Sequence, residues 1–375
     1  MPEPAFAVLP GVVSGHDDGP LRRVIDEARR LGLEVWGHAG LWCYGGEVFP
    51  ELAARDLFGR PLPESTLPWG TGFCPSKPAL HEWIKLSLVD VARRYDLDGM
   101  FLDHARYTSP GHGPSLLSCG CPDCEAAAAE RGRDFADFRA GLLSAREALG
   151  RLRADRSSAE TGAVETLGWL AGHSGVVDWF VFRARLLADR FADAAQAVRT
   201  AAGRPFSFGT DVFPPSVGLL GGHIYREWAR GATYLTGGFG GKIGWSTVGA
   251  VTIDNLSPWL VEWAPGLDRG AAARLVANLI GYDAPSLGLR FGANGRIDDH
   301  GQPIRSLLAE FGRMATARGG LPVYPPVAVA DEAALGTVCR AIADAGLQGA
   351  MFSGLERFTG EQRAIVRREL LERLS

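Results

Sequence analysis

The chain has 375 residues, 46% of them hydrophobic, and a formal net charge of -4 at pH 7. This length suits one large barrel or two smaller domains, and the apolar content is enough for a substantial core. A slightly acidic chain without a basic block has no electrostatic footprint for nucleic acid, and no apolar run is long enough to cross a bilayer. The first residues show no charged-then-apolar signal segment, so we expect a cytoplasmic protein with no nucleic-acid or membrane partner.

Apolar runs and amphipathic helices alternate along the chain. A short apolar run at 6–13 comes first, and we expect the barrel to be irregular at its first strand. The number of units that follow favours a closed (β/α)8 TIM barrel, with 1–375 as a single domain. In chain order we expect a helix at 21–31, a strand at 33–38, a helix at 78–95, a strand at 99–103, a helix at 178–202, strands at 205–211 and 321–327, a helix at 331–345, a strand at 347–354 and a helix after Thr359.

Two regions interrupt this alternation. Residues 119–175 are charged and rich in Ala and Arg, which predicts a loop followed by an elongated helical insertion within the barrel. Between 221 and 250 the glycine-rich sequence predicts a strand and a loop. No Gly-Lys-Ser/Thr follows these glycines, so a phosphate-binding loop is not expected.

Four cysteines form the most informative pattern in the sequence. Cys74 is followed, after a long gap, by Cys119, Cys121 and Cys124. Three thiols within six residues pair poorly as disulfides, whereas a tetrahedral zinc ion accepts four thiolates without strain. The pattern therefore predicts a structural zinc site that joins two loops, with His112 as an alternative ligand.

The other two cysteines, Cys43 and Cys339, lie in apolar surroundings. A free cysteine in such a segment is most often a small buried hydrophobic residue. We therefore expect neither of them to bind the metal.

Two carboxylates end predicted strands. Asp103 closes the run GMFLD and Asp211 closes FSFGTD. Catalytic residues of a barrel lie at the carboxyl ends of its strands, so neighbouring strands would bring both side chains into one pocket. Either aspartate could instead cap a helix or accept loop hydrogen bonds. Glu356 and Asp254 are alternative acids if Asp211 faces away.

Further pocket candidates lie near these strand ends. His38 ends a predicted strand and would either bind a sugar hydroxyl or form a satisfied buried histidine. Arg106 would position Asp103 or form a surface ion pair. Ten tryptophans against seven tyrosines raise a carbohydrate hypothesis, although any one Trp is more often part of the core. The full set of expected substrate-binding residues is His38, Trp42, His104, Arg106, Tyr107 and Trp245, with Trp36 as a further stacking candidate.

The segments around Asp103 resemble those of a known group of proteins. Phe73-Cys-Pro-Ser-Lys-Pro78, and Tyr95-Asp-Leu-Asp-Gly-Met-Phe-Leu-Asp103-His-Ala-Arg-Tyr107, are similar to segments of the glycosyl-hydrolase-like TIM barrels. Thr210-Asp211-Val-Phe213 is similar to their fifth strand. The likeness runs from about residue 20 onward and is strongest at 73–107. It implies a barrel and a glycosidase activity.

The order and spacing of the four cysteines resemble the zinc site of the zinc-containing trimeric bacterial β-galactosidases. Those enzymes carry an Asn-Glu pair after the fourth strand, where this chain has His104-Ala105. Alanine cannot transfer a proton, and the seventh-strand glutamate has no counterpart in Leu321-Pro-Val-Tyr324. The resemblance therefore implies shared architecture but not shared catalytic residues.

Together the sequence predicts a glycosidase that cleaves an O-glycosidic bond, with Asp103 as nucleophile and Asp211 as general acid and base. The alternative is a non-catalytic carbohydrate-binding barrel, because the related catalytic glutamate is replaced by Ala105. A catalytic metal inside the barrel is disfavoured, since the strand ends offer no His-x-His pair. The partner expected in either case is a carbohydrate. The sugar, the linkage, the stereochemistry and a homo-oligomeric assembly stay open.

Overall fold

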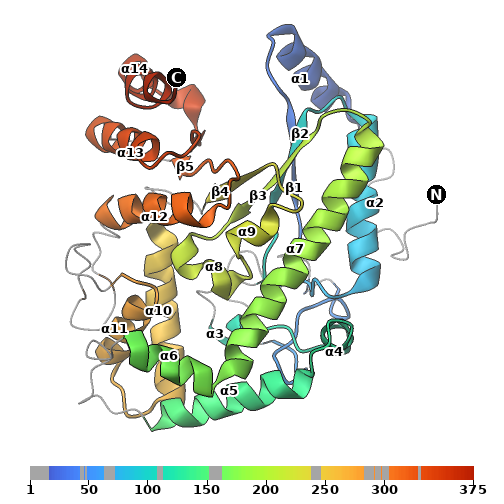
Figure 1. The fold of residues 1–375 in the computed structure, drawn as a ribbon. Coiled ribbons are helices and arrows are strands. Elements are labelled where there is room, and N and C mark those ends of the chain that lie inside the picture. The colour runs from blue at the N-terminus through green and yellow to red at the C-terminus, as the bar shows by residue number, and fades with distance from the viewer. Residues whose placement is uncertain are drawn as a thin grey trace.

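The computed structural model describes the greater part of the chain as a mixed α/β fold (Figure 1). No helix in this part is both long and apolar enough to cross a membrane. The described residues are 17–42, 46, 49–62, 72–107, 113–151, 163–237, 246–282, 291, 297, 304–327 and 331–375.

The strands are parallel and follow one another in space in the order of the sequence. Four of them form a sheet in the order β1-β2-β3-β4, and two further strands pair with each other. A parallel bridge between Leu235 and Val323 joins the sheet to the segment that leads into the second pair. The strands are β1 (Trp36–Gly40), β2 (Gly99–Asp103), β3 (Ser207–Val212), β4 (Tyr234–Gly237), β5 (Pro326–Val327) and β6 (Met351–Phe352).

Helices provide the crossovers between the strands. Proline at the first turn starts α2 (Pro78–Arg94), and the left-handed Gly203 ends α7 (Ser174–Ala202). These two helices pack against each other and run alongside the sheet (Figure 1). The helices before and after them are α1 (Gly19–Arg30), α8 (Pro215–Gly221), α9 (Tyr225–Trp228), α10 (Ser246–Trp263), α11 (Arg269–Leu279), α12 (Ile304–Ala317), α13 (Glu332–Asp344), α14 (Gly360–Val366), a π-helical turn (Arg367–Leu371) and α15 (Glu372–Leu374).

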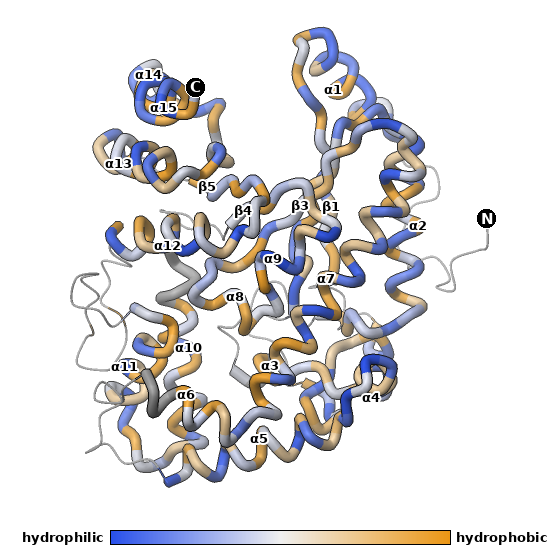
Figure 2. The backbone as a smooth tube through the Cα atoms, in the orientation of Figure 1, coloured by the Kyte–Doolittle hydropathy of each residue, from blue (hydrophilic) through white to orange (hydrophobic). Residues whose placement is uncertain are grey.

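In its described part, the segment between β2 and α7 consists of short helices joined by turns and loops. Asp134 caps α5 (Phe135–Gly150) by accepting a hydrogen bond from the Ala136 amide, and hydrophilic and hydrophobic residues are interspersed along this helix (Figure 2). Its buried stripe includes Phe138, which packs against Trp179 and Phe182 of α7. The helices of this segment are α3 (Gly113–Leu116), α4 (Pro122–Ala129), α5 (Phe135–Gly150) and α6 (Ala163–Gly172).

The α/β class and the parallel strands expected from the sequence are confirmed. The closed eight-stranded barrel stays a prediction, because the apolar run at 6–13 and the residues at 283–290 lie outside the described part. The first strand begins three residues later than expected, at Trp36. The region at 221–250 also contains more helix than expected, namely α9 and the start of α10.

Candidate functional site

Two aspartates lie at the carboxyl ends of neighbouring strands. Asp103 is the last residue of β2, and Asp211 is the last but one of β3. The register pairs Leu102 with Thr210, so each aspartate occupies the next position on its strand. Side chains alternate between faces and neighbouring strands lie about 4.8 Å apart, so both carboxyl groups leave the same face of the sheet.

Asp211 is the buried member of this pair, with 3% of its surface exposed. Its Oδ1 accepts a hydrogen bond of 2.9 Å from the backbone amide of His104. Its Oδ2 has no hydrogen-bond partner among the described residues. Burial and, after it, the negative charge of Asp103 raise the pKa of Asp211 to about 8, against the opposing effect of Arg106. The Asp211 carboxyl group is therefore protonated at neutral pH.

Asp103 is the accessible member, with 24% of its side chain exposed. Its Oδ2 lies 3.4 Å from Nδ1 of His104 and 3.6 Å from Nε2 of His38. His104 has a left-handed backbone, with φ of 60°. Burial, followed by the charges of Arg106 and His38, lowers the pKa of His104 to about 3, so its ring is neutral. A strained backbone beside a carboxylate pair is typical of a functional site.

The loop after β2 packs tightly against neighbouring segments. The Arg106 guanidinium is buried and lies 5.1 Å from the centre of the Phe213 ring. The Tyr107 amide donates to the Gly221 carbonyl, and the Tyr107 ring lies 4.2 Å from the Arg183 guanidinium. These contacts hold Arg106 and Tyr107 away from solvent.

The other predicted pocket residues divide by their exposure. His38 has 63% of its side chain exposed and stacks on Phe101, with ring centres 5.2 Å apart. Trp36 is 38% exposed and contacts Tyr234. Trp42, at 2%, belongs to the core instead of the pocket, because burying a large flat ring stabilises the fold more than exposing it.

Some candidates lie away from the pair or outside the described part. Asp254 sits on α10 and its Oδ1 accepts from the Ile297 amide at 2.9 Å. Glu356 follows β6 on an exposed turn and pairs with Arg357. Trp245 and His112 fall outside the described residues, as does Cys43.

Three residues near the site carried no sequence signal. Thr236 pairs with Asp211 in the β3–β4 register, is buried, and has a hydroxyl without a partner among the described residues. His223 contacts the loops that follow both aspartates. Arg183 is buried next to Tyr107. Each lies far in sequence from Asp103, so only the strand register and the packing reveal its proximity.

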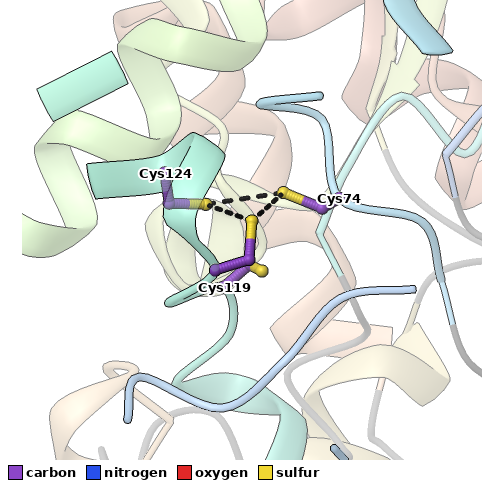
Figure 3. A group of neighbouring side chains, drawn as sticks. Cys74, Cys119 and Cys124 are labelled. Atoms are coloured by element: carbon purple, nitrogen blue, oxygen red, sulfur yellow. Dashed lines mark hydrogen bonds between the residues drawn. The ribbon is translucent and has the colours of Figure 1, made fainter. Parts of the chain in front are cut away.

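The four predicted cysteines come together. Their ligand atoms all lie within 4.8 Å of one another, and all four side chains are buried. The Cys74 sulfur lies 3.6 Å from that of Cys121 and 3.4 Å from that of Cys124, toward which it points (Figure 3). The sulfurs of a tetrahedral site with metal–sulfur bonds of about 2.3 Å lie about 3.8 Å apart. The cluster therefore has the dimensions of a four-thiolate metal site.

The surroundings of the cluster also fit thiolates and a cation. The Arg55 amide donates to the Cys119 sulfur at 3.1 Å, and the Ser76 hydroxyl lies 3.1 Å from the Cys124 sulfur. Burial raises the pKa of the Cys74 and Cys124 thiols, so a bound cation is needed to keep all four deprotonated. Cys339 is buried elsewhere, as predicted.

A buried arginine, Arg183, lies near this cluster. Nη1 of Arg183 donates to the Leu116 carbonyl at 2.6 Å, just before the second group of cysteines. Burial lowers the pKa of Arg183 to about 10, which leaves it charged at neutral pH, and the nearby Tyr107, Cys119 and Cys124 oppose the shift. Its charge therefore favours anionic sulfur in the cluster.

No family model matches the chain, and no curated protein matches it significantly. Several solved structures are distantly similar. The PgaB (BpsB) glycoside hydrolase domain from Bordetella bronchiseptica is 13% identical over 86% of this chain and 78% of its own, with a TM-score of 0.39. A β-galactosidase from the psychrophilic Marinomonas ef1 is 12% identical over 86% and 56%, with a TM-score of 0.40. Alpha-L-fucosidase isoenzyme 2 from Paenibacillus thiaminolyticus is 14% identical over 91% and 55%, with a TM-score of 0.31.

Proposed function

We propose that the chain is a glycoside hydrolase that cleaves an O-glycosidic bond with Asp103 and Asp211. The observation that carries this proposal is the asymmetry of the carboxylate pair. Asp103 is accessible, whereas burial and the charge of Asp103 keep Asp211 protonated at neutral pH. Glycosidases need this division, because one group attacks while the other donates a proton.

The spacing of the strands supports a retaining reaction. Retaining enzymes hold their carboxyl groups about 5–5.5 Å apart and inverting ones about 6.5–9.5 Å. Adjacent positions on strands about 4.8 Å apart suit the shorter range. In the first step a carboxylate oxygen of Asp103 bonds to the anomeric carbon, and Asp211 protonates the departing glycosidic oxygen. In the second step Asp211 removes a proton from water, which hydrolyses the ester and releases Asp103.

Neighbouring side chains would orient the sugar and the carboxylates. His38 is exposed beside Asp103, so we assign it to a sugar hydroxyl. His104 is neutral and within reach of the same carboxylate. Arg106 and Tyr107 are buried, and we assign them to support of the loop instead of direct contact.

The four cysteines would hold a structural zinc ion. Four thiolates are the ligand set that zinc adopts in structural sites, and they leave no open position for water or substrate. A zinc ion there would cross-link the segment before α2 to the loop and first turn of α4. Catalysis is assigned to the carboxylates alone.

A panel of aryl glycosides and oligosaccharides tests the proposal. Asp103→Asn should lower kcat/KM more than about a thousandfold while the protein stays folded, because the nucleophile is removed. Asp96→Asn is the matched control, since Asp96 is an exposed carboxylate at the opposite end of β2. Full activity in Asp103→Asn would rule out the assignment.

One observation favours a second candidate, a non-catalytic carbohydrate-binding protein. Asp211 has almost no exposed surface, and its hydrogen bond to the His104 amide also suits a structural role. Calorimetry with the same sugars separates the two functions. Binding without turnover, unchanged in Asp211→Asn, would support the binding protein.

A further inference from the structure

His223 occupies a fixed position between the two strand ends. Helix α8 ends at Gly221 and is followed by Gly222, which has φ of 93°, and the His223 amide donates to the Gly218 carbonyl at 2.8 Å. A Cβ at Gly222 would lie 2.5 Å from the Leu187 side chain and 3.0 Å from Tyr107, so this turn needs glycine. The backbone therefore presents the His223 side chain in one direction.

Both ring nitrogens of His223 are engaged. Nδ1 accepts a hydrogen bond of 2.9 Å from the Phe213 amide, so the ring proton resides on Nε2. Nε2 donates to the Ala105 carbonyl at 3.1 Å. The ring also packs against the rings of Phe213 and Trp228, with centres 5.5 Å and 5.4 Å away. One tautomer in one orientation satisfies all of these contacts.

The two hydrogen-bond partners of His223 follow the two aspartates at equal distance along the chain. Ala105 is two residues after Asp103, and Phe213 is two residues after Asp211. The β2–β3 ladder holds the strands together only as far as Leu102 and Thr210. Beyond that point, the His104–Asp211 hydrogen bond and the His223 ring connect the segments that follow the two strands.

We propose that His223 is a positioning residue that fixes the placement of Asp103 relative to Asp211 by bridging the loops that follow them. The effect of His223 on catalysis rests on the proposed function, whereas the bridge between the two loops does not. His223 is not a general acid or base, because it is buried and neither nitrogen is available. Its pKa is lowered to about 3, by burial and then by Arg106, which agrees with a neutral bridge.

Two conservative variants each remove half of the bridge. In asparagine the amide oxygen is bonded to Cγ, as Nδ1 is in histidine, so His223→Asn keeps an acceptor for Phe213 and loses the donor to Ala105. Glutamine carries its amide at the ε position, so His223→Gln keeps the donor and loses the acceptor. His173, whose ring contacts the Trp169 carbonyl between α6 and α7, provides the control His173→Asn.

Carbon-13 NMR of aspartate-labelled protein measures the titration of the carboxylate pair without any substrate. Spectra of Asp103→Asn and Asp211→Asn assign the signals, and Arg106, His104 and His38 are the other charged or titratable groups facing the pair. We expect the upper apparent pKa of the pair to fall by about one unit in both His223 variants, because looser strand ends separate the charges and admit water. His173→Asn should leave it unchanged.

Kinetics on an accepted glycoside then distinguish positioning from general stability. We expect kcat to fall about tenfold with KM changed less than about threefold, since misplaced groups affect the reacting geometry more than binding. Folded variants with wild-type titration and wild-type kcat would overturn the proposal. If the titration shifts but no glycoside is cleaved by any form, the bridge stands and the proposed function fails.

A measurement on the unaltered protein guards against variants that do not fold. Nitrogen-15 NMR of the histidine rings should show His223 as the Nε2–H tautomer, with no protonation down to about pH 5. A His223 ring that titrates near its ordinary value would overturn the bridge directly.

Discussion

The cysteine cluster and the carboxylate pair are two groups of titratable side chains, and both draw residues from β2 or the segment that follows it. They differ in solvent exposure. All four cysteines are buried and face one another, which closes the ligand set. The pair instead combines a buried Asp211 with an accessible Asp103. A closed set of identical groups suits a structural metal, whereas groups in unlike environments suit proton transfer.

The two sites also differ in how they offset the free-energy cost of burying a charged group. Buried thiolates would be stabilised by a bound cation, and the Arg55 amide already donates to the Cys119 sulfur. No ion-sized cluster of ligands forms at the pair among the described residues, and Asp211 becomes neutral by retaining its proton. Loss of a bound metal should therefore lower stability, whereas a permanently neutral side chain at position 211 should raise it at a pH where Asp211 would ionise.

The largest effect is expected at the cysteine cluster. Cys121→Ser should abolish the binding of one zinc ion per chain and lower the free energy of unfolding by roughly 5 kcal/mol, part of the 10–16 kcal/mol that structural zinc supplies in small domains. Metal analysis and thermal unfolding measure both quantities. Cys339→Ser, at a buried thiol outside the cluster, should retain the zinc. Unchanged metal content in Cys121→Ser would show that the cysteine cluster is not the metal site.

A smaller and pH-dependent effect is expected at Asp211. Its pKa is raised on folding, so its contribution to stability is complete below its unfolded value near 4 and is lost as the pH rises to about 8. Over that range the group lowers stability by up to about 1.4 kcal/mol per pH unit. Asp211→Asn should remove this slope and be more stable than the wild type at pH 9.

Urea unfolding at pH 5, 7 and 9 measures the Asp211 effect. Asp103→Asn serves as a comparison, because loss of its negative charge should lower the pKa of Asp211 and reduce the slope without abolishing it. Parallel pH profiles for all three proteins would show that Asp211 titrates at its ordinary value.

The smallest effect is expected at His38, which is exposed beside Asp103. His38→Ala should change the free energy of unfolding by less than about 0.5 kcal/mol, because the side chain is largely exposed. Under the proposed function, the same variant should weaken sugar binding measurably in calorimetry. A loss of more than about 1 kcal/mol of stability would instead assign His38 to the fold.

The sequence by itself determined the local elements and the chemistry carried by single segments. Gly99–Asp103 is a strand, as its apolar run predicts, and a helix follows Thr359 as expected, where the structure shows a capping box. The four cysteines were recognisable because their residue type and spacing fit one metal geometry. The strand, the start of the helix and the three clustered cysteines depend on residues that are neighbours in the sequence, and residue type alone pointed to Cys74 as the fourth ligand.

Only the tertiary structure decided which distant residues share an environment. Burial separates Trp42 from the pocket and makes Asp211 the protonated partner, and neither property is encoded within the short runs around these residues. His223 joins the ends of two strands through backbone atoms, which any residue possesses. Secondary structure follows from the periodicity of nearby residues. The burial of a side chain, its protonation state and its hydrogen bonds to distant segments depend instead on elements that come together only when the chain folds.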